Sequence, residues 1–209
     1  MNRYRINLRQ ATLLIIISLI CLIALSLTKQ WTKNQIEHNE RAWFEAQLNV
    51  LIPATLHNNT LLNDRAFVAD INDLSPTNQL SVYRARLDGA PTAAVIHAIT
   101  PDGYNGPIEL LVAVDYSGMV LGVRILNHHE TPNMGDEFSQ PQSRWLEKFE
   151  HRSLTDPDTR GWNIRKDGGD FEQFTSATIT PRAIIHAIQR TLDYYQRHRD
   201  LIFQTPGSP

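Results

Sequence analysis

The run from Asp167 to Pro181 gathers residue types that suit phosphate binding. It holds the glycines Gly168 and Gly169, followed by hydroxyl-bearing and small residues at 175–178. These residues come just before a predicted helix, and the free N–H groups and positive dipole end of a helix N-terminus attract anions. A glycine turn followed by a Ser/Thr helix cap gives the same pattern. The residue types alone leave both interpretations open.

The chain lacks the motifs of several other chemistries. It contains neither GxGxxG nor GxxxxGK[ST], so no Rossmann fingerprint or P-loop supports nucleotide binding. One Cys in 209 residues excludes an internal disulfide and a cysteine metal cluster. Lys and Arg number 20 against 22 Asp and Glu, which disfavours duplex nucleic acid as a partner. We expect redox chemistry, if present, to come from a bound cofactor.

His128, His129 and Glu130 are of metal-ligand types. Adjacent residues of a strand point to opposite faces of a sheet, so the two imidazoles do not easily share one ion. We therefore predict no metal site.

Helices and strands must position these residues. Four strand candidates span 80–87, 93–100, 108–116 and 119–127, with Asp88-Gly89 and Ser117-Gly118 as hairpin turns. The polar stretch before them, 54–78, is interpreted as loops with short elements.

A short helix is predicted over 141–150, and a long one after Thr180, with Thr180 as N-cap and Pro181 as its first residue. Its predicted buried stripe comprises Ile184, Ile185, Ile188, Leu192 and Tyr195. We predict an α+β fold, an antiparallel β-meander flanked by helices.

The N-terminal region has the properties of a membrane anchor. Residues 10–28 carry no charge and form a helix of about 28 Å, close to the hydrocarbon thickness of roughly 30 Å. Arg3, Arg5 and Arg9 precede this span, which predicts a cytoplasmic N-terminus and an outer domain. A cleaved signal peptide is the alternative; the apolar run is long for one, and Ile20 before Cys21 disfavours a lipoprotein.

The expected organisation is a cytoplasmic tail at 1–9, a transmembrane helix at 10–28, an amphipathic connector helix at 29–53 that ends at Pro53, and an extracytoplasmic domain at 54–209.

Three stretches resemble one protein family. Glu172-Gln-Phe-Thr175-Ser176-Ala177-Thr178 is similar to a flavinylation motif, in which a magnesium-dependent flavin transferase esterifies the last Thr to FMN. The wider run 167–181, with 100–108 and 128–136, resembles the G subunit of the Rnf ion-translocating electron transport complex, also called Rsx. With the anchor, the resemblance covers nearly the whole chain in the expected order.

This resemblance implies FMN bound covalently to Thr178 through a phosphodiester. It implies that the cofactor also lies near Thr175, Ser176 and Ala177, near the loop of Glu130, Thr131, Pro132, Met134 and Gly135, and near Lys166 and Asp167. Asp102, Tyr104 and Asn105 form either a third wall of the site or a simple β-turn. Trp145 and Trp162 either stack on the flavin ring or pack in the core, and we expect core packing for each. This sequence departs from the family where Ser176 and Asn133 replace glycines.

The implied function is electron transfer within a bacterial inner-membrane complex that couples ferredoxin and NAD redox chemistry to ion translocation, without independent turnover by this chain. The implied partners are the other membrane proteins of the complex, the flavin transferase and the membrane. Three alternatives remain: a protein like the C subunit of the sodium-pumping NADH:quinone reductase, an anchored binding or assembly module without a cofactor, and a hydrolase using Ser176 or Thr178. No GxSxG motif supports the hydrolase.

Overall fold

The computed structural model describes residues 8–69, 74–76, 78–132, 135–139, 143–174 and 177–204 of the chain. It divides into two compact units, Met1–Phe44 and Glu45–Pro209.

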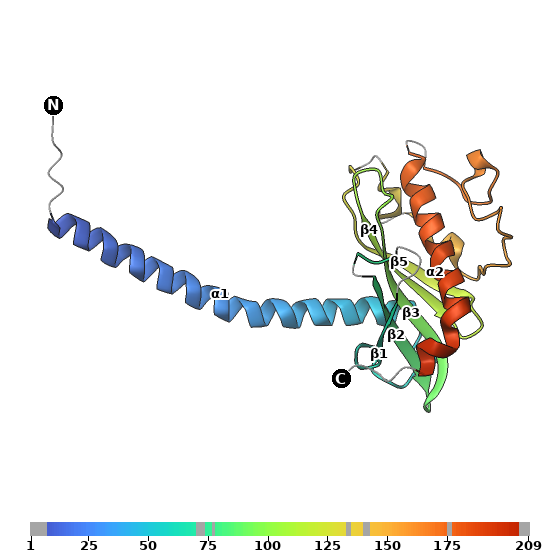
Figure 1. Ribbon diagram of the computed structural model, residues 1–209, viewed down its shortest axis with the longest axis horizontal. Coiled ribbons are helices and arrows are strands. Elements are labelled where there is room, and N and C mark those ends of the chain that lie inside the picture. The colour runs from blue at the N-terminus through green and yellow to red at the C-terminus, as the bar shows by residue number, and fades with distance from the viewer. Residues whose placement is uncertain are drawn as a thin grey trace. The chain divides into compact units, whose positions relative to one another are not determined.

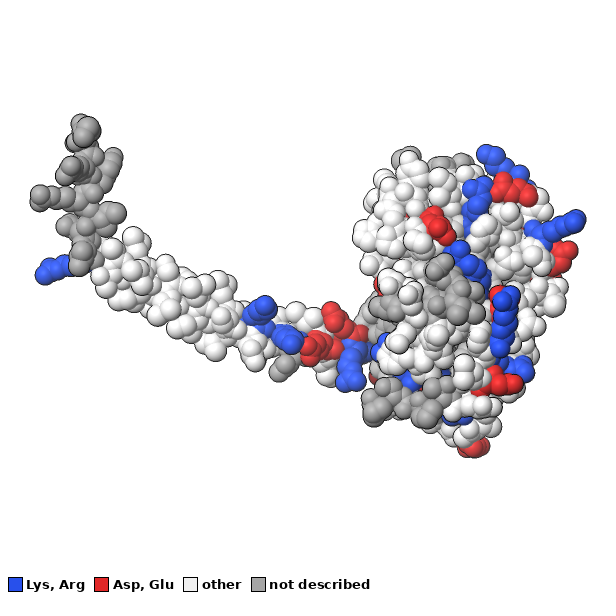
Figure 2. All heavy atoms as spheres, viewed as in Figure 1, with Lys and Arg blue, Asp and Glu red and all other residues white. Residues whose placement is uncertain are grey.

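The first unit is built on helix α1, which spans Leu8–Leu51 and continues into the second unit. Its apolar window has a mean hydropathy of 2.7 and none of it is buried, so this helix is long and apolar enough to cross a membrane. Figure 2 shows the uncharged stretch between basic groups. Within this part of the helix, the Thr28 hydroxyl donates to the Ala24 carbonyl at 2.9 Å, which satisfies it without water.

The second unit contains one five-stranded antiparallel sheet in the order β1-β2-β3-β4-β5 (Figure 1). The strands are β1 (Arg65–Ala69), β2 (Gln79–Leu87), β3 (Ala90–Thr100), β4 (Ile108–Asp115) and β5 (Val120–Asn127). Asp88 and Gly89 both have positive φ, 51° and 82°, as a tight two-residue hairpin requires. The predicted meander is confirmed. Sequence analysis missed β1, because this short edge strand buries only Ala66 and Val68.

Helix α2 (Ile179–Gln204) packs against one face of this sheet, across β3 and β4. The predicted stripe is confirmed, since every one of its five members is at most 1% exposed. Leu48, Leu51 and Ile52, at and just beyond the end of α1, are also buried, and Leu51 lies close to Gly122 of β5. A large apolar area thereby leaves water, which stabilises the domain and fixes α2 on the sheet.

Two helix predictions need correction. Helix α2 begins at Ile179 and not after Thr180, and the carbonyl of Thr178 accepts the N–H of Arg182 at 3.4 Å. Pro181 still lies in the first turn, where it loses no helical hydrogen bond.

The predicted helix at 141–150 is a 3₁₀ helix, η3, over Leu146–Phe149 only, and 140–142 lie outside the described residues. Its aromatic side chains face a cluster of rings and do not form a helical stripe; the cluster comprises Trp145, Phe149, Trp162, Phe171 and Phe174. The other 3₁₀ helices are η1 (Leu61–Asn63), η2 (Glu137–Ser139) and η4 (Arg165–Asp167).

The C-terminal end of α2 is held by two arginines of β2. Arg84, only 2% exposed, donates to the Ile202 carbonyl at 3.0 Å, and Arg86 donates to the Phe203 carbonyl at 3.0 Å. Asp64 forms ion pairs with both guanidinium groups. Cations at a helix C-terminus satisfy its free carbonyls and complement its dipole.

We predict that Asp64→Asn lowers the free energy of unfolding by about 2 to 3 kcal/mol, because it leaves the Arg84 guanidinium buried without its counter-charge. Denaturant titration of the purified chain, followed by the fluorescence of its buried tryptophans, measures this change. Asp193→Asn breaks an exposed i,i+4 pair with Arg197 and serves as the control, with an expected loss of about 0.5 kcal/mol or less. Equal losses in both variants would contradict the prediction.

Candidate functional site

A cavity of about 260 Å³ opens beside the N-terminus of α2. Its lining brings together three segments that are far apart in the sequence: Tyr104; Glu130 and Thr131; and the run from Ala177 to Thr180. Thr178 is half-buried and stands immediately before the helix, where the unpaired N–H groups favour an anion.

Two buried polar atoms of this lining have no hydrogen-bond partner among the described residues, Glu130 Oε2 and Thr180 Oγ1. The glutamate is 5% exposed and the threonine is fully buried. Both lie near Gly135, whose φ of +90° suits glycine; a Cβ there would stand 3.2 Å from Glu130 Oε2 and 3.3 Å from Thr180 Oγ1. Buried polar groups without a partner are costly, so these two atoms are candidates for hydrogen bonds to a bound ligand.

The loop 101–106 closes one side of the cavity. The Asn105 side chain donates to Thr131 Oγ1 at 2.9 Å, and its backbone N–H donates to Glu130 Oε1 at 3.4 Å. Tyr104 is 69% exposed at the edge of the cavity. The sequence leaves open whether this loop forms a wall of the site or a simple β-turn. In the structure the loop contacts Glu130 and Thr131, and Tyr104 lines the cavity.

Asp167 lies beside the first turn of α2 without lining the cavity. Its carboxylate accepts from Arg182 Nε at 2.8 Å and Nη2 at 2.5 Å. Lys166 precedes it on η4 with its side chain exposed. The proximity of these two residues to the cofactor stays a prediction.

Arg182, His186 and Arg190 lie four residues apart along α2, so they share one helix face. Arg182 forms an ion pair with Asp167, and Arg190 Nη2 lies 3.2 Å from Asp102 Oδ2. The helix thereby fixes two separate segments of the chain. Figure 2 shows basic and acidic groups intermixed on the side of the domain that carries α2. Sequence analysis missed this stripe, although its i, i+4, i+8 spacing was visible.

Glu172, the acid of the stretch that resembles a flavinylation motif, does not line the cavity. It forms ion pairs with Lys148 and Arg165, and these charges lower the pKa of its carboxyl group, the hydrogen bond from Lys148 most strongly. The backbone carbonyl of Glu172 accepts the Trp145 indole N–H at 2.7 Å. These contacts anchor the segment that leads toward Thr178.

The remaining predicted residues fall into three groups. Thr175, Ser176 and Met134 lie outside the described residues. Pro132 is exposed and does not line the cavity. Trp145 and Trp162 are buried in the aromatic cluster, which confirms that they pack in the core. Among the described residues, no group of three or more His, Cys, Asp or Glu is placed to hold a metal ion.

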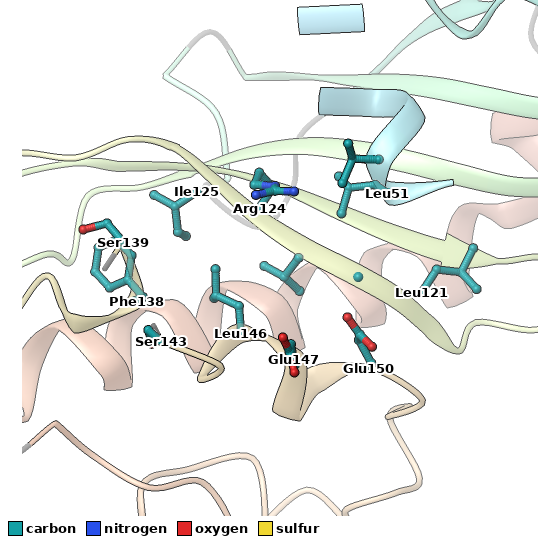
Figure 3. Close-up of a pocket in the computed structure, with 13 residues that line it drawn as sticks. Leu51, Leu121, Arg124, Ile125, Phe138, Ser139, Ser143, Leu146, Glu147 and Glu150 are labelled. Atoms are coloured by element: carbon teal, nitrogen blue, oxygen red, sulfur yellow. The ribbon is translucent and has the colours of Figure 1, made fainter. Parts of the chain in front are cut away.

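A larger cavity of about 470 Å³ lies along β5 (Figure 3). Leu51 borders it on one side, and Leu146, Glu147 and Glu150 border it on the other. None of the buried, unpartnered polar atoms found in the described residues lines this cavity, and the helix start that borders it belongs to the four-residue 3₁₀ helix η3. The candidate site is therefore the smaller cavity at Thr178.

Comparison with known proteins agrees with this choice. A family model described as an FMN-binding domain matches residues 103–193, a range that contains the whole lining of the smaller cavity. The G subunit of the ion-translocating oxidoreductase complex of Shewanella loihica is 37% identical over 200 residues, which cover 96% of this chain and 94% of the relative. The corresponding G subunits of Vibrio parahaemolyticus and Vibrio cholerae are each 40% identical, over 87% of this chain and 85% and 87% of theirs.

The chain belongs to the family of these G subunits. The resemblance drawn from the three sequence stretches is thereby confirmed, and so is an FMN-binding α+β domain behind an apolar N-terminal helix. For a member of this family, the hydrogen-bonding groups that line the smaller cavity are candidate contacts for FMN.

We predict that the stability of the domain falls as the pH drops below about 6.5, in part through His186. Burial lowers the pKa of this imidazole, and Arg190 and Arg182 lower it further, whereas Asp102 and Asp167 oppose them. The unfolded chain therefore binds a proton first as the pH falls, so the free energy of unfolding decreases between the usual histidine pKa and the lower native one. Denaturant titrations at several pH values should show a smaller decrease for His186→Gln. Parallel curves for the two proteins would contradict this assignment.

Proposed function

We propose that this chain carries electrons through an FMN that is bound covalently to Thr178 by a phosphodiester. The observation that carries the proposal is the position of Thr178. It precedes α2 directly and borders a cavity whose lining residues Glu130 and Thr180 each have a buried polar atom without a hydrogen-bond partner among the described residues. The helix N-terminus favours the phosphate, and covalent attachment keeps the cofactor on the protein between electron transfers.

The residues at the cavity fit the flavin. The flavin ring carries an N–H between two carbonyl groups, and Glu130 Oε2 offers an acceptor while the Thr180 hydroxyl offers a donor. The cavity of about 260 Å³ is smaller than the roughly 300–1,000 Å³ of pockets that enclose a whole ligand. It therefore takes part of the FMN and leaves the remainder outside, where a redox partner has access.

FMN supplies the oxidation and reduction chemistry when bound, and the protein holds it in place and adjusts its reduction potential through nearby charges and hydrogen bonds. No acid, base or nucleophile of this chain has to turn over. The relatives are named as members of an ion-translocating oxidoreductase complex. We accordingly assign the chain to relaying electrons between other proteins of such a complex. The relatives' name favours this assignment over a protein like the C subunit of the sodium-pumping reductase.

Mass spectrometry of the chain produced together with a flavin transferase tests the covalent bond. The wild type should gain the mass of one FMN less one water, and Thr178→Val should gain nothing, because the attachment oxygen is removed. Thr155→Val is the control: it removes an exposed threonine hydroxyl that does not line the cavity and should keep the gain. An unmodified wild-type mass in the presence of active transferase would support an anchored module without a cofactor.

We further propose that the N-terminus is cytoplasmic and that the FMN domain lies on the outer side of the membrane. The three arginines before the apolar stretch support this orientation. The flavin would then accept and deliver electrons outside the cytoplasm.

Cysteine labelling in intact cells tests the orientation. In a Cys21→Ala background, a membrane-impermeant maleimide should modify Gln196→Cys, an exposed position on α2, once it has access to the periplasm. It should modify Asn2→Cys only after the inner membrane is opened. The reverse pattern would show that the domain faces the cytoplasm.

A further inference from the structure

Tyr104 stands out because a large aromatic side chain is held exposed at the edge of the cofactor cavity. It lines the cavity with Thr131 and Thr178, yet 69% of its surface is accessible to solvent. Aromatic rings contribute most when another surface covers them, and they prefer offset or edge-on contact with a second ring system. The exposed ring therefore offers a flat surface to a planar ligand.

The loop that carries Tyr104 is fixed on its N-terminal side. The Asp102 carboxylate accepts from Arg190 Nη2 at 3.2 Å and from Thr100 Oγ1 at 3.2 Å. Arg190 Nη2 also lies 3.2 Å from Thr100 Oγ1, and Thr100 is fully buried. Helix α2 thus holds the start of the loop through a charged contact.

The same loop is fixed on its C-terminal side by Asn105, which bonds to Glu130 and Thr131. Gly103 permits this close approach: a Cβ there would stand 2.2 Å from the Gly106 carbonyl oxygen and 2.9 Å from Glu130 Oε1. A turn that only reverses the chain direction in solvent does not need contacts on both sides. The contacts hold Tyr104 at the cavity before any ligand binds.

We propose that Tyr104 is an aromatic wall of the cofactor site, its ring packing against the isoalloxazine ring of FMN. Arg190 acts through Asp102 as a positioning residue for this wall. The inference rests on the proposed attachment of FMN at Thr178, and it adds a residue that contacts the ring at the far end of the cofactor from the phosphate. The surface that Tyr104 exposes in this structure is covered by the flavin in the loaded protein.

Flavin fluorescence of the full-length, FMN-loaded chain tests the contact. A tyrosine touching an excited flavin donates an electron and then regains it, which quenches emission with no net reaction. Tyr104→Leu removes both the ring and the donor, so emission per bound flavin should rise several-fold. Tyr104→Phe keeps a ring but removes the readily oxidised phenol, so emission should also rise while the flavin absorption bands stay closer to those of the wild type.

Tyr116→Leu is the matched control. Tyr116 is also a partly exposed tyrosine, but it packs on Arg199 and Phe203 near the other end of α2. Arg199 is 21 residues from Thr178, which is about 31 Å along a helix. Replacement of Tyr116 should leave flavin emission unchanged.

Asp102→Asn tests the positioning role, because it weakens the contact with Arg190 and leaves the tyrosine in place. Emission should rise part of the way toward that of Tyr104→Leu, and Asp102→Glu should restore part of the quenching. If Asp102→Asn has the same emission as the wild type, Arg190 and Asp102 do not position Tyr104.

The outcomes separate the inference from the proposed function. If Tyr104→Leu carries one FMN by mass and its emission equals that of the wild type, Tyr104 does not contact the flavin and the inference is wrong, although the flavin assignment stands. If Tyr104→Leu carries no FMN, the emission of Tyr104→Phe is compared with that of the wild type instead, and equal emission shows that the inference is wrong. A wild-type chain without FMN overturns the proposed function itself.

Discussion

The packing of α2 on the sheet is the constraint on which the site depends. Ile184, Ile185 and Ile188 are fully buried, so the helix has one position and its N-terminus has one location. Its C-terminal carbonyls are taken by Arg84 and Arg86. The two ends therefore differ: protein cations neutralise the negative end of the helix dipole, and the positive end lies beside the cavity at Thr178.

The helix also organises the loops around that end. Arg182 and Arg190 lie on one face and bind carboxylates from two separate segments, Asp167 of η4 and Asp102 of the loop 101–106. Loops carry much of the function of a protein but need a rigid scaffold to place them. In the proposed site, a single buried helix provides the terminus that would face the phosphate and the anchors for the surrounding loops. A change on α2 is thus expected to reach the cofactor through loop position as well as through direct contact.

Local patterns predicted most of the elements and missed those that depend on neighbours. The four long strands and the α2 stripe follow from hydrophobic periodicity, which burial on the sheet enforces. Strand β1 has only two inward side chains, and it becomes a strand because β2 offers backbone partners. The segment around Trp145 has a helical spacing of apolar residues. Its rings, Trp145 and Phe149, pack on each other and on Phe174 and Phe171, and only a short 3₁₀ helix forms there.

The sequence by itself determined the apolar N-terminal span, the meander and a hydroxyl-rich segment before a long helix, since each is a property of neighbouring residues. Resemblance to a family then indicated the cofactor and predicted its attachment residue. Only the tertiary structure decided that Tyr104, Glu130 and Thr180 meet Thr178 at one cavity. These residues come from separate loops and the helix start, and their convergence depends on strand register and on the packing of α2, which no local pattern encodes.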